Sequence, residues 1–344
     1  MLYPTKPRAG ERVAVLSPAA GLPAILPLPF DLGLTRLREE FGLVPVEYPT
    51  TRQMGASPRA RAADVNAAFA DPSITAIIAS IGGDDLITVL RHLDPDVIRA
   101  NPKPFFGFSD CTNLLAYLYR LGIVGYHGGA IMTAFGRPLA MHDVTRDSLE
   151  AALFSRGEYV LPVPSEFTDI GGRWEDPATF TLEPEMLVHT GWTWHHANRE
   201  VTGRSWGGCL EIVAWLLMAD VAVPPLDEFE GSVLFFETSE EMPPATEVYQ
   251  VLRNLGERGI LERCGALLLG RPKAWTFQTP STPAERDAFV TAQEEAVARA
   301  MSEYAPGTMY VTGLDIGHTD PQLILPYGGN ITVDGALRRI TVEY

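Results

Sequence analysis

The sequence predicts an α/β protein whose first half builds a parallel sheet. Short runs of β-branched and apolar residues alternate there with amphipathic segments, the pattern of βα units feeding parallel strands. The chain has 344 residues, enough for two domains, and 46% hydrophobic against 20% charged residues is the balance of a soluble globular protein. A disordered chain or a small disulfide scaffold is therefore excluded.

The predicted elements of the first half follow one another at regular spacing. The expected strands are Arg12–Ser17, Leu43–Tyr48, Ala76–Ser80, Pro104–Phe108 and Ile123–Tyr126. Between them, apolar residues at helical spacing predict helices over Asp31–Phe41, Arg59–Ala70, Asp84–Leu93 and Cys111–Leu121.

The periodicity then stops from about Arg156 to Arg204, where prolines, paired glycines and three tryptophans indicate a crossover with some strand content. Regular patterns resume with expected helices at Leu210–Met218, Ala245–Arg258 and Ala284–Tyr304 and expected strands at Gly231–Glu237 and Ala266–Leu269. A hairpin closes the chain, with Asp334-Gly335 supplying the tight turn between Ile331 and Arg339.

Charge and cysteine content limit the binding partners and the cellular compartment that we expect for this protein. The 27 basic and 43 acidic side chains give a net charge of −16, with no basic stripe, so binding to a nucleic-acid polymer is not expected. Three widely spaced cysteines fit a reducing compartment. No signal peptide is visible at the N-terminus, and the longest apolar stretch, Leu210–Val223, is too short to span a bilayer. We expect a cytoplasmic protein without membrane contact.

The clearest candidate for chemistry is the strand-to-helix junction around Ser109. Gly107 precedes the serine by two residues, and a sharp turn there would lift its hydroxyl into the crevice at a helix start, as in a nucleophile elbow. The alternative is that Ser109 or Asp110 only caps the helix. Cys111 stands where hydrolase elbows usually have glycine, which weakens the elbow interpretation.

A nucleophilic serine needs a base and an orienting carboxylate, and the second half offers both. His318 follows Gly317 in a loop, and Glu237 ends a predicted strand, so both side chains could emerge at sheet edges; each could equally be an ordinary surface residue. Earlier in the chain, Gly82-Gly83 precedes a helix and could cradle an anion or form an oxyanion hole, or it could be a plain turn.

Other candidate groups are weaker. His189, His195 and His196 lack the cysteine or carboxylate partners of a closed site, so no metal is expected. The nearby tryptophans could stack on a flat ligand or pack a domain junction.

Together these segments resemble the LD-carboxypeptidase family of serine peptidases, and most closely its microcin C self-immunity branch. The resemblance extends over nearly the whole chain, and its motifs are Ser80-Ile-Gly-Gly-Asp84, Gly107-Phe-Ser-Asp-Cys-Thr112, Ser205-Trp-Gly-Gly208, Leu234-Phe-Phe-Glu-Thr-Ser-Glu-Glu241, Gly317-His-Thr-Asp-Pro321 and Leu325-Pro-Tyr-Gly328. It implies Ser109 as nucleophile, His318 as general base and acid, and Glu237 as the residue that orients His318. It also implies an oxyanion hole from the backbone N–H groups of Gly83 and Asp110, and no cofactor.

The resemblance also implies an architecture. Residues 1–160 would form a Rossmann-like domain that carries the nucleophile. Residues 161–204 would be the crossover, and 205–344 a smaller mixed α/β, barrel-like domain that carries the glutamate and histidine. The site would lie between the domains, and a homodimer is expected because family members are generally dimers.

Two substrates are open under this resemblance. One branch of the family removes the terminal D-alanine from murein tetrapeptides, and the other cleaves an amide that joins a peptidyl or aminoacyl group to a modified nucleotide. The motifs favour the second branch, in which an aromatic stacks on the base, and Trp192, Trp194 and Trp206 are the candidates for it. Gly82 is a further candidate for substrate binding. An alternative hypothesis for the function is a non-catalytic protein that binds a small anionic ligand at Gly82-Gly83.

Overall fold

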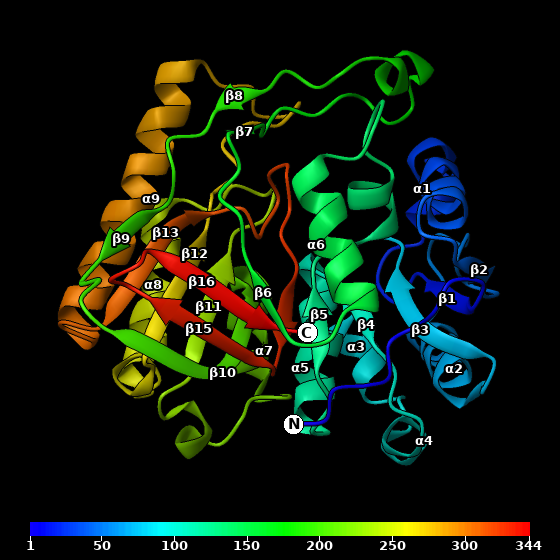
Figure 1. The fold of residues 1–344 in the computed structure, drawn as a ribbon, viewed down its shortest axis with the longest axis horizontal. Helices are drawn as coiled ribbons and strands as arrows, with labels where there is room; N and C mark the ends of the chain where they lie inside the picture. The colour runs from blue at the N-terminus through cyan, green and yellow to red at the C-terminus, as the bar shows by residue number, and fades with distance from the viewer.

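The computed structural model describes residues 1–344 and contains a six-stranded sheet built mostly from the first half (Figure 1). Its strand order is β14-β5-β4-β3-β1-β2, and all neighbours are parallel except β14, which runs antiparallel to β5. The strands are β1 (Arg12–Leu16), β2 (Val44–Glu47), β3 (Ile74–Ala79), β4 (Phe105–Gly107), β5 (Gly125–His127) and β14 (Leu325–Tyr327). The predicted parallel sheet is confirmed, and each of its five expected strands is present with small shifts at the ends.

Helices connect these strands. They are α1 (Pro27–Glu39), α2 (Pro58–Ala70), α3 (Ile87–Leu90), α4 (Pro95–Ala100), α5 (Thr112–Arg120) and α6 (Asp143–Phe154), with shorter turns at η1 (Leu22–Ala24), η2 (Ser109–Cys111) and η3 (Ile131–Phe135). The sequence patterns missed α4 and α6. The first is six residues long and begins at a cap in which the Asp94 carboxylate accepts from the N–H groups of Asp96 and Val97.

The second sheet has eight strands in the order β6-β16-β15-β10-β11-β12-β13-β9. Strands β10 to β13 are parallel, and the outer pairs are antiparallel. The strands are β6 (Glu158–Val160), β9 (Thr193–His195), β10 (Glu200–Cys209), β11 (Val233–Glu237), β12 (Ala266–Gly270), β13 (Met309–Leu314), β15 (Asn330–Asp334) and β16 (Arg339–Glu343). The helices are α7 (Leu210–Ala219), α8 (Ala245–Glu257) and α9 (Pro283–Tyr304), with η4 (Pro177–Thr181), η5 (Leu226–Phe229) and η6 (Leu261–Arg263).

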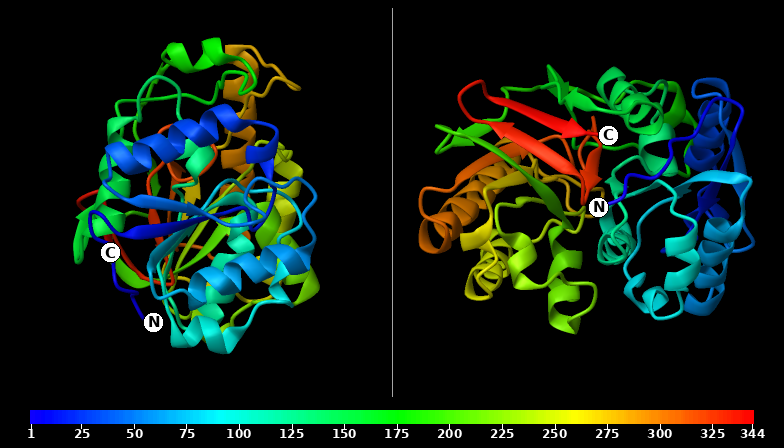
Figure 2. Two further views of the ribbon diagram at one scale, coloured as in Figure 1. Left: turned by 90° about the vertical axis from the view of Figure 1, so that its right-hand side faces the viewer. Right: turned by 60° about the horizontal axis from the view of Figure 1, so that its bottom comes forward.

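The two sheets lie side by side, and the crossover runs over them with the small β7 (Glu166–Phe167) and β8 (Leu187–Val188) pair (Figures 1 and 2). The division at residues 160 and 205 stays a prediction, because strands are exchanged across it: β14 completes the first sheet, whereas β6 borders the second. One continuous cluster of 84 buried apolar residues extends through both halves, so they share a core. None of the helices combines the length and the apolar character needed to cross a membrane.

Candidate active site

Ser109 stands at the turn between β4 and α5, and its backbone is in the left-handed region with φ of 58°. A residue with a Cβ pays roughly 1–2 kcal/mol for that conformation. The buried strand before the turn and the buried helix after it hold the backbone there. This is the geometry of a nucleophile elbow, in which strain exposes the hydroxyl at the carboxyl end of a parallel sheet.

Asp110 ties this turn to the loop after β3. One carboxylate oxygen accepts from the backbone N–H of Leu86 at 2.9 Å, and the other accepts from the side chain of Asn113 at 2.7 Å. Burial raises the pKa of Asp110 to about 6, and these hydrogen bonds pull it back only in part. The side chain therefore fixes the distance between the two loops, while its backbone N–H stays beside Ser109.

Gly82 makes the close approach of these loops possible. A Cβ on Gly82 would lie 2.8 Å from Cβ and 2.9 Å from Oγ of Ser109, and 3.4 Å from the backbone nitrogen of Asp110. Gly83 lines the same cavity as Ser109. The loop for which the sequence allows an anion cradle, an oxyanion hole or a plain turn therefore lies against the candidate nucleophile.

A hydrogen bond between Glu237 and His318 joins a strand end to a loop of the second sheet. Oε2 of Glu237, at the end of β11, lies 2.6 Å from Nδ1 of His318, in the loop after β13. Both side chains are buried, with 0% and 8% of their surface exposed. Side chains at positions 270 and 317 would collide with Glu237, because a Cβ there would lie 2.6 Å and 2.8 Å from its Cβ.

Two carboxylates act on His318. Burial disfavours the imidazolium, but Glu237 and Glu240 outweigh it and raise the pKa of His318 well above its ordinary value. Glu240 Oε2 lies 3.1 Å from Nε2, an ion pair without hydrogen-bond geometry. Although partial burial opposes it, contact with His318 lowers the pKa of Glu240 to about 2. The Glu240 side chain is 58% exposed, so it is free to move off the imidazole.

The loop that carries His318 is anchored on both sides. Asp315 Oδ2 accepts from the indole of Trp192 at 2.9 Å and lies 3.1 Å from the imidazole of His189. Gln322 donates to the carbonyl of Gly317 at 2.9 Å. Phe108, the residue before Ser109, packs its ring against that of His318 with centroids 4.9 Å apart. The imidazole is therefore held at the junction of the two halves.

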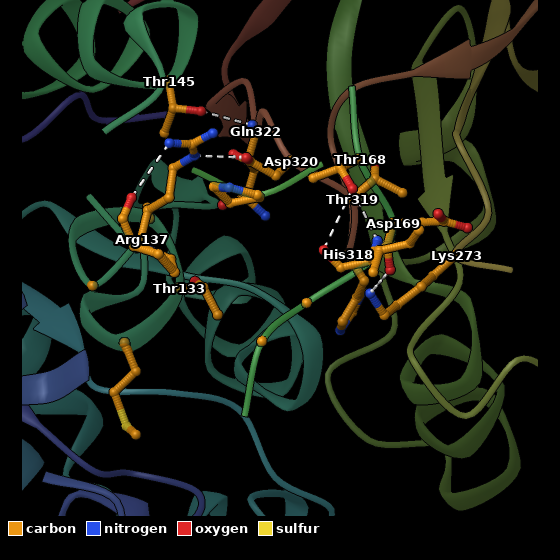
Figure 3. Close-up of a pocket in the computed structure, with 18 of the residues that line it drawn as sticks. Thr133, Arg137, Thr145, Thr168, Asp169, Lys273, His318, Thr319, Asp320 and Gln322 are labelled. Carbon is orange, nitrogen blue, oxygen red and sulfur yellow. Dashed lines mark hydrogen bonds and ion pairs between the residues drawn. The ribbon is translucent and has the colours of Figure 1, made fainter. Parts of the chain in front are cut away.

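A cavity with two limbs opens at this junction. The first limb, with an empty volume of about 740 Å³, is lined by Gly82, Gly83, Ser109, Trp174 and Glu240 among others. The second, of about 830 Å³, runs between Arg137 and the crossover (Figure 3). The limbs share five lining residues: Phe108, Thr133, Trp174, Lys273 and His318. Ser109, His318 and Glu240 therefore face one space.

The tryptophans singled out in the sequence lie elsewhere. Trp206 is buried against Phe229, with ring centroids 5.0 Å apart. The indole of Trp192 donates a hydrogen bond to Asp315, and Trp194 lies in β9. None of these three tryptophans lines either limb of the cavity. Trp174, from the same crossover, lines both.

Sequence reasoning also missed Glu240 and Lys273 as lining residues. A signal was available for each, because Glu240 follows Glu237 by three residues and Lys273 follows the end of β12 by three.

Other side chains that could act as nucleophiles or bases are buried or packed against neighbouring side chains. Cys111 is fully buried, and burial raises the pKa of its thiol well above the ordinary value, so it is a poor nucleophile. His195 stacks on Tyr310 with centroids 4.1 Å apart. No three His, Cys, Asp or Glu side chains are grouped so that they could hold a metal ion.

The strain at Ser109 predicts that glycine is better than alanine there. In urea unfolding, the free energy of unfolding of Ser109→Gly should exceed that of Ser109→Ala by about 1 kcal/mol, because glycine adopts the left-handed region without a Cβ penalty. Cys111, with φ of −64°, is the matched control. There Cys111→Gly should be less stable than Cys111→Ala, and a Ser109 pair with that same order would contradict the strained turn.

The contact with Glu240 predicts the titration of His318. Glu240→Gln removes a negative charge that favours the imidazolium, so the pKa of His318 measured by NMR should fall. Glu241→Gln is the control, because Glu241 is exposed and forms no ion pair. If the two substitutions leave the same His318 titration, Glu240 does not set it.

Known proteins match the whole chain. Sequence models of the LD-carboxypeptidase N-terminal and C-terminal domains match residues 13–128 and 202–333. The microcin self-immunity protein MccF of Escherichia coli is 26% identical, over 82% of this chain and 77% of its own. A Bacillus subtilis protein named a probable murein peptide carboxypeptidase is 25% identical, over 98% of this chain and 94% of its own.

The fold agrees with these sequence matches. A solved structure of an MccF variant with adenosine monophosphate superposes with a TM-score of 0.86 at 24% identity, covering 100% of this chain and 99% of that one. This likeness confirms the predicted two-domain α/β fold class. With both family domains present in order, the chain belongs to the LD-carboxypeptidase family of peptidases.

Proposed function

We propose that this peptidase hydrolyses an amide bond through an acyl-enzyme, with Ser109 as nucleophile, His318 as general base and acid, and Glu237 as the residue that orients His318. The observation that carries the proposal is the 2.6 Å hydrogen bond between the buried Glu237 and His318, whose imidazole lines the same cavity as Ser109. The strained turn at Ser109 supports it.

In the first step, Nε2 of His318 takes the proton of the Ser109 hydroxyl while Oγ bonds to the carbonyl carbon. For this, Glu240 must leave Nε2, and His318 must be neutral. Because its pKa is raised, the neutral fraction grows as pH rises, so kcat/KM rises with pH through that pKa. Glu237 accepts from Nδ1 and stabilises the imidazolium that forms.

The negative charge that develops on the carbonyl oxygen requires donors. The backbone N–H groups of Gly83 and Asp110 are assigned to this role, because the loops that carry them meet at Ser109. Each would contribute about 3 kcal/mol to the transition state. The tetrahedral intermediate collapses as His318 protonates the leaving nitrogen and the C–N bond breaks. Water, deprotonated by His318, then attacks the ester, and Oγ recovers its proton.

The substrate we propose is an aminoacyl- or peptidyl-nucleotide. Structures of MccF are known with aspartyl sulfamoyl adenosine and glutamyl sulfamoyl guanosine, and an MccF-like protein of Streptococcus pneumoniae is known with AMP. Trp174, which lines both limbs of the cavity, offers a flat face for a base. The second candidate is a murein tetrapeptide, favoured by the Bacillus subtilis relative.

The nucleophile is tested with a fluorophosphonate probe. Wild-type protein and Cys111→Ser should label, and Ser109→Ala should not. A folded wild-type protein that never labels would instead favour the non-catalytic binding protein.

Substitution of the other two residues tests the base and its orienting carboxylate. His318→Ala should lower kcat about 10²- to 10⁴-fold, and Glu237→Ala should lower it less, with both variants folded by circular dichroism.

The substrate class is tested by mass spectrometry. The protein is incubated separately with an aminoacyl sulfamoyl nucleoside and with a murein tetrapeptide, and Ser109→Ala serves as the blank. We expect release of the amino acid from the first. Loss of alanine from the second alone would assign the protein to murein peptides instead.

A further inference from the structure

Two cations line the cavity, and they differ in how their charge is compensated. Arg137 donates to Asp320 at 2.7 Å and to Glu183 at 2.6 Å, so two carboxylates neutralise it. Lys273 has no carboxylate within ion-pair distance; its ammonium donates to the backbone carbonyl of Asp169 at 2.5 Å. Figure 3 draws Lys273 and His318 on one side of the cavity and Arg137 on the other.

The carboxylate of Asp169, whose backbone carbonyl accepts from Lys273, already has other partners. Asp169 Oδ1 pairs with Arg286 at 3.1 Å, and Oδ2 accepts from the backbone N–H of Ala274 at 3.2 Å. Burial lowers the pKa of Lys273, and the fields of Asp169, Glu240 and Asp320 do not make up for it. An ammonium ion that is desolvated without an ion-pair partner is costly, and an anionic ligand would remove that cost.

The position of Lys273 indicates which part of the ligand carries the anion. Lys273 and His318 line both limbs, whereas Ser109 lines only the first. His318 protonates the leaving nitrogen in the proposed reaction, so the leaving group lies on the side of His318 and Lys273.

We propose that Lys273 binds an anionic group of the leaving portion of the substrate, close to the scissile nitrogen. This inference rests on the proposed function and adds a requirement to it. A peptide with a free C-terminus has its carboxylate one carbon away from the scissile nitrogen, and an acyl phosphoramidate has its phosphorus bonded to that nitrogen. Both candidate substrates therefore carry an anionic group close to the scissile nitrogen, and Lys273 is a specificity residue for both.

Binding in the Ser109→Ala background tests the inference without turnover. Calorimetry compares a tetrapeptide ending in D-alanine with its C-terminal amide, and an aminoacyl phosphoramidate with its neutral methyl ester. With Lys273 present, the anionic member of one pair should bind about 10- to 100-fold more tightly, the usual strength of a charged hydrogen bond. The pair that shows the preference identifies the source of the anion. Lys273→Met should abolish the preference, and Lys273→Arg should retain most of it.

Lys103→Met is the matched control. Lys103 is buried whereas Lys273 is partly buried, and both donate to backbone carbonyls, Lys103 to those of Ala68 and Asp71. Lys103 lines neither limb. Its substitution should leave the preference for the anion intact, whatever it does to the melting temperature.

Two outcomes overturn the inference: no preference in either pair, or a preference that survives Lys273→Met. Failure of the proposed function looks different, because Ser109 would then not label with fluorophosphonate. An intact anion preference without labelling would keep the Lys273 assignment and reject the catalytic one.

Discussion

The buried hydrogen bond between Glu237 and His318 is the constraint on which the rest of this site depends. A carboxylate with no exposed surface needs a partner, and the imidazole is the group that meets it at hydrogen-bond distance. The bond joins the end of β11 to the loop after β13, with β12 between them, so it forms only when three parallel strands are in register. The glycines at 270 and 317 leave the space, and Asp315 and Gln322 fix the loop.

Charge is distributed unevenly between the molecule and its cavity. The chain carries a net charge of −16, and Glu240 adds a carboxylate beside His318. An anionic substrate is therefore repelled at long range and needs compensation at the site itself. Besides Arg137, which Asp320 and Glu183 neutralise, the positive groups that line the cavity are the His318 imidazolium and the Lys273 ammonium. Glu240 lies 3.1 Å from Nε2 of the imidazole, and its side chain is 58% exposed.

Much of this arrangement was predictable from the sequence, and the failures have physical causes. Buried parallel strands ending in glycine or polar residues located β3, β4 and β11, and with them Gly82, Ser109 and Glu237. The pattern missed β10, because Gly203, Gly207 and Gly208 resemble a loop although they lie in a ten-residue strand. The sequence could not tell which tryptophan lines the cavity, because the crossover has little regular structure and so no periodicity that indicates the direction of a side chain.

Strand β14 comes from the end of the chain but completes a sheet whose other strands all come from the first half. Residues 325–327 form the edge of the first sheet beside β5, yet they are synthesised about two hundred residues later. On the ribosome, β5 remains an uncovered edge throughout that interval, open to pairing with other nascent chains. Premature termination anywhere before residue 325 would leave that edge permanently bare.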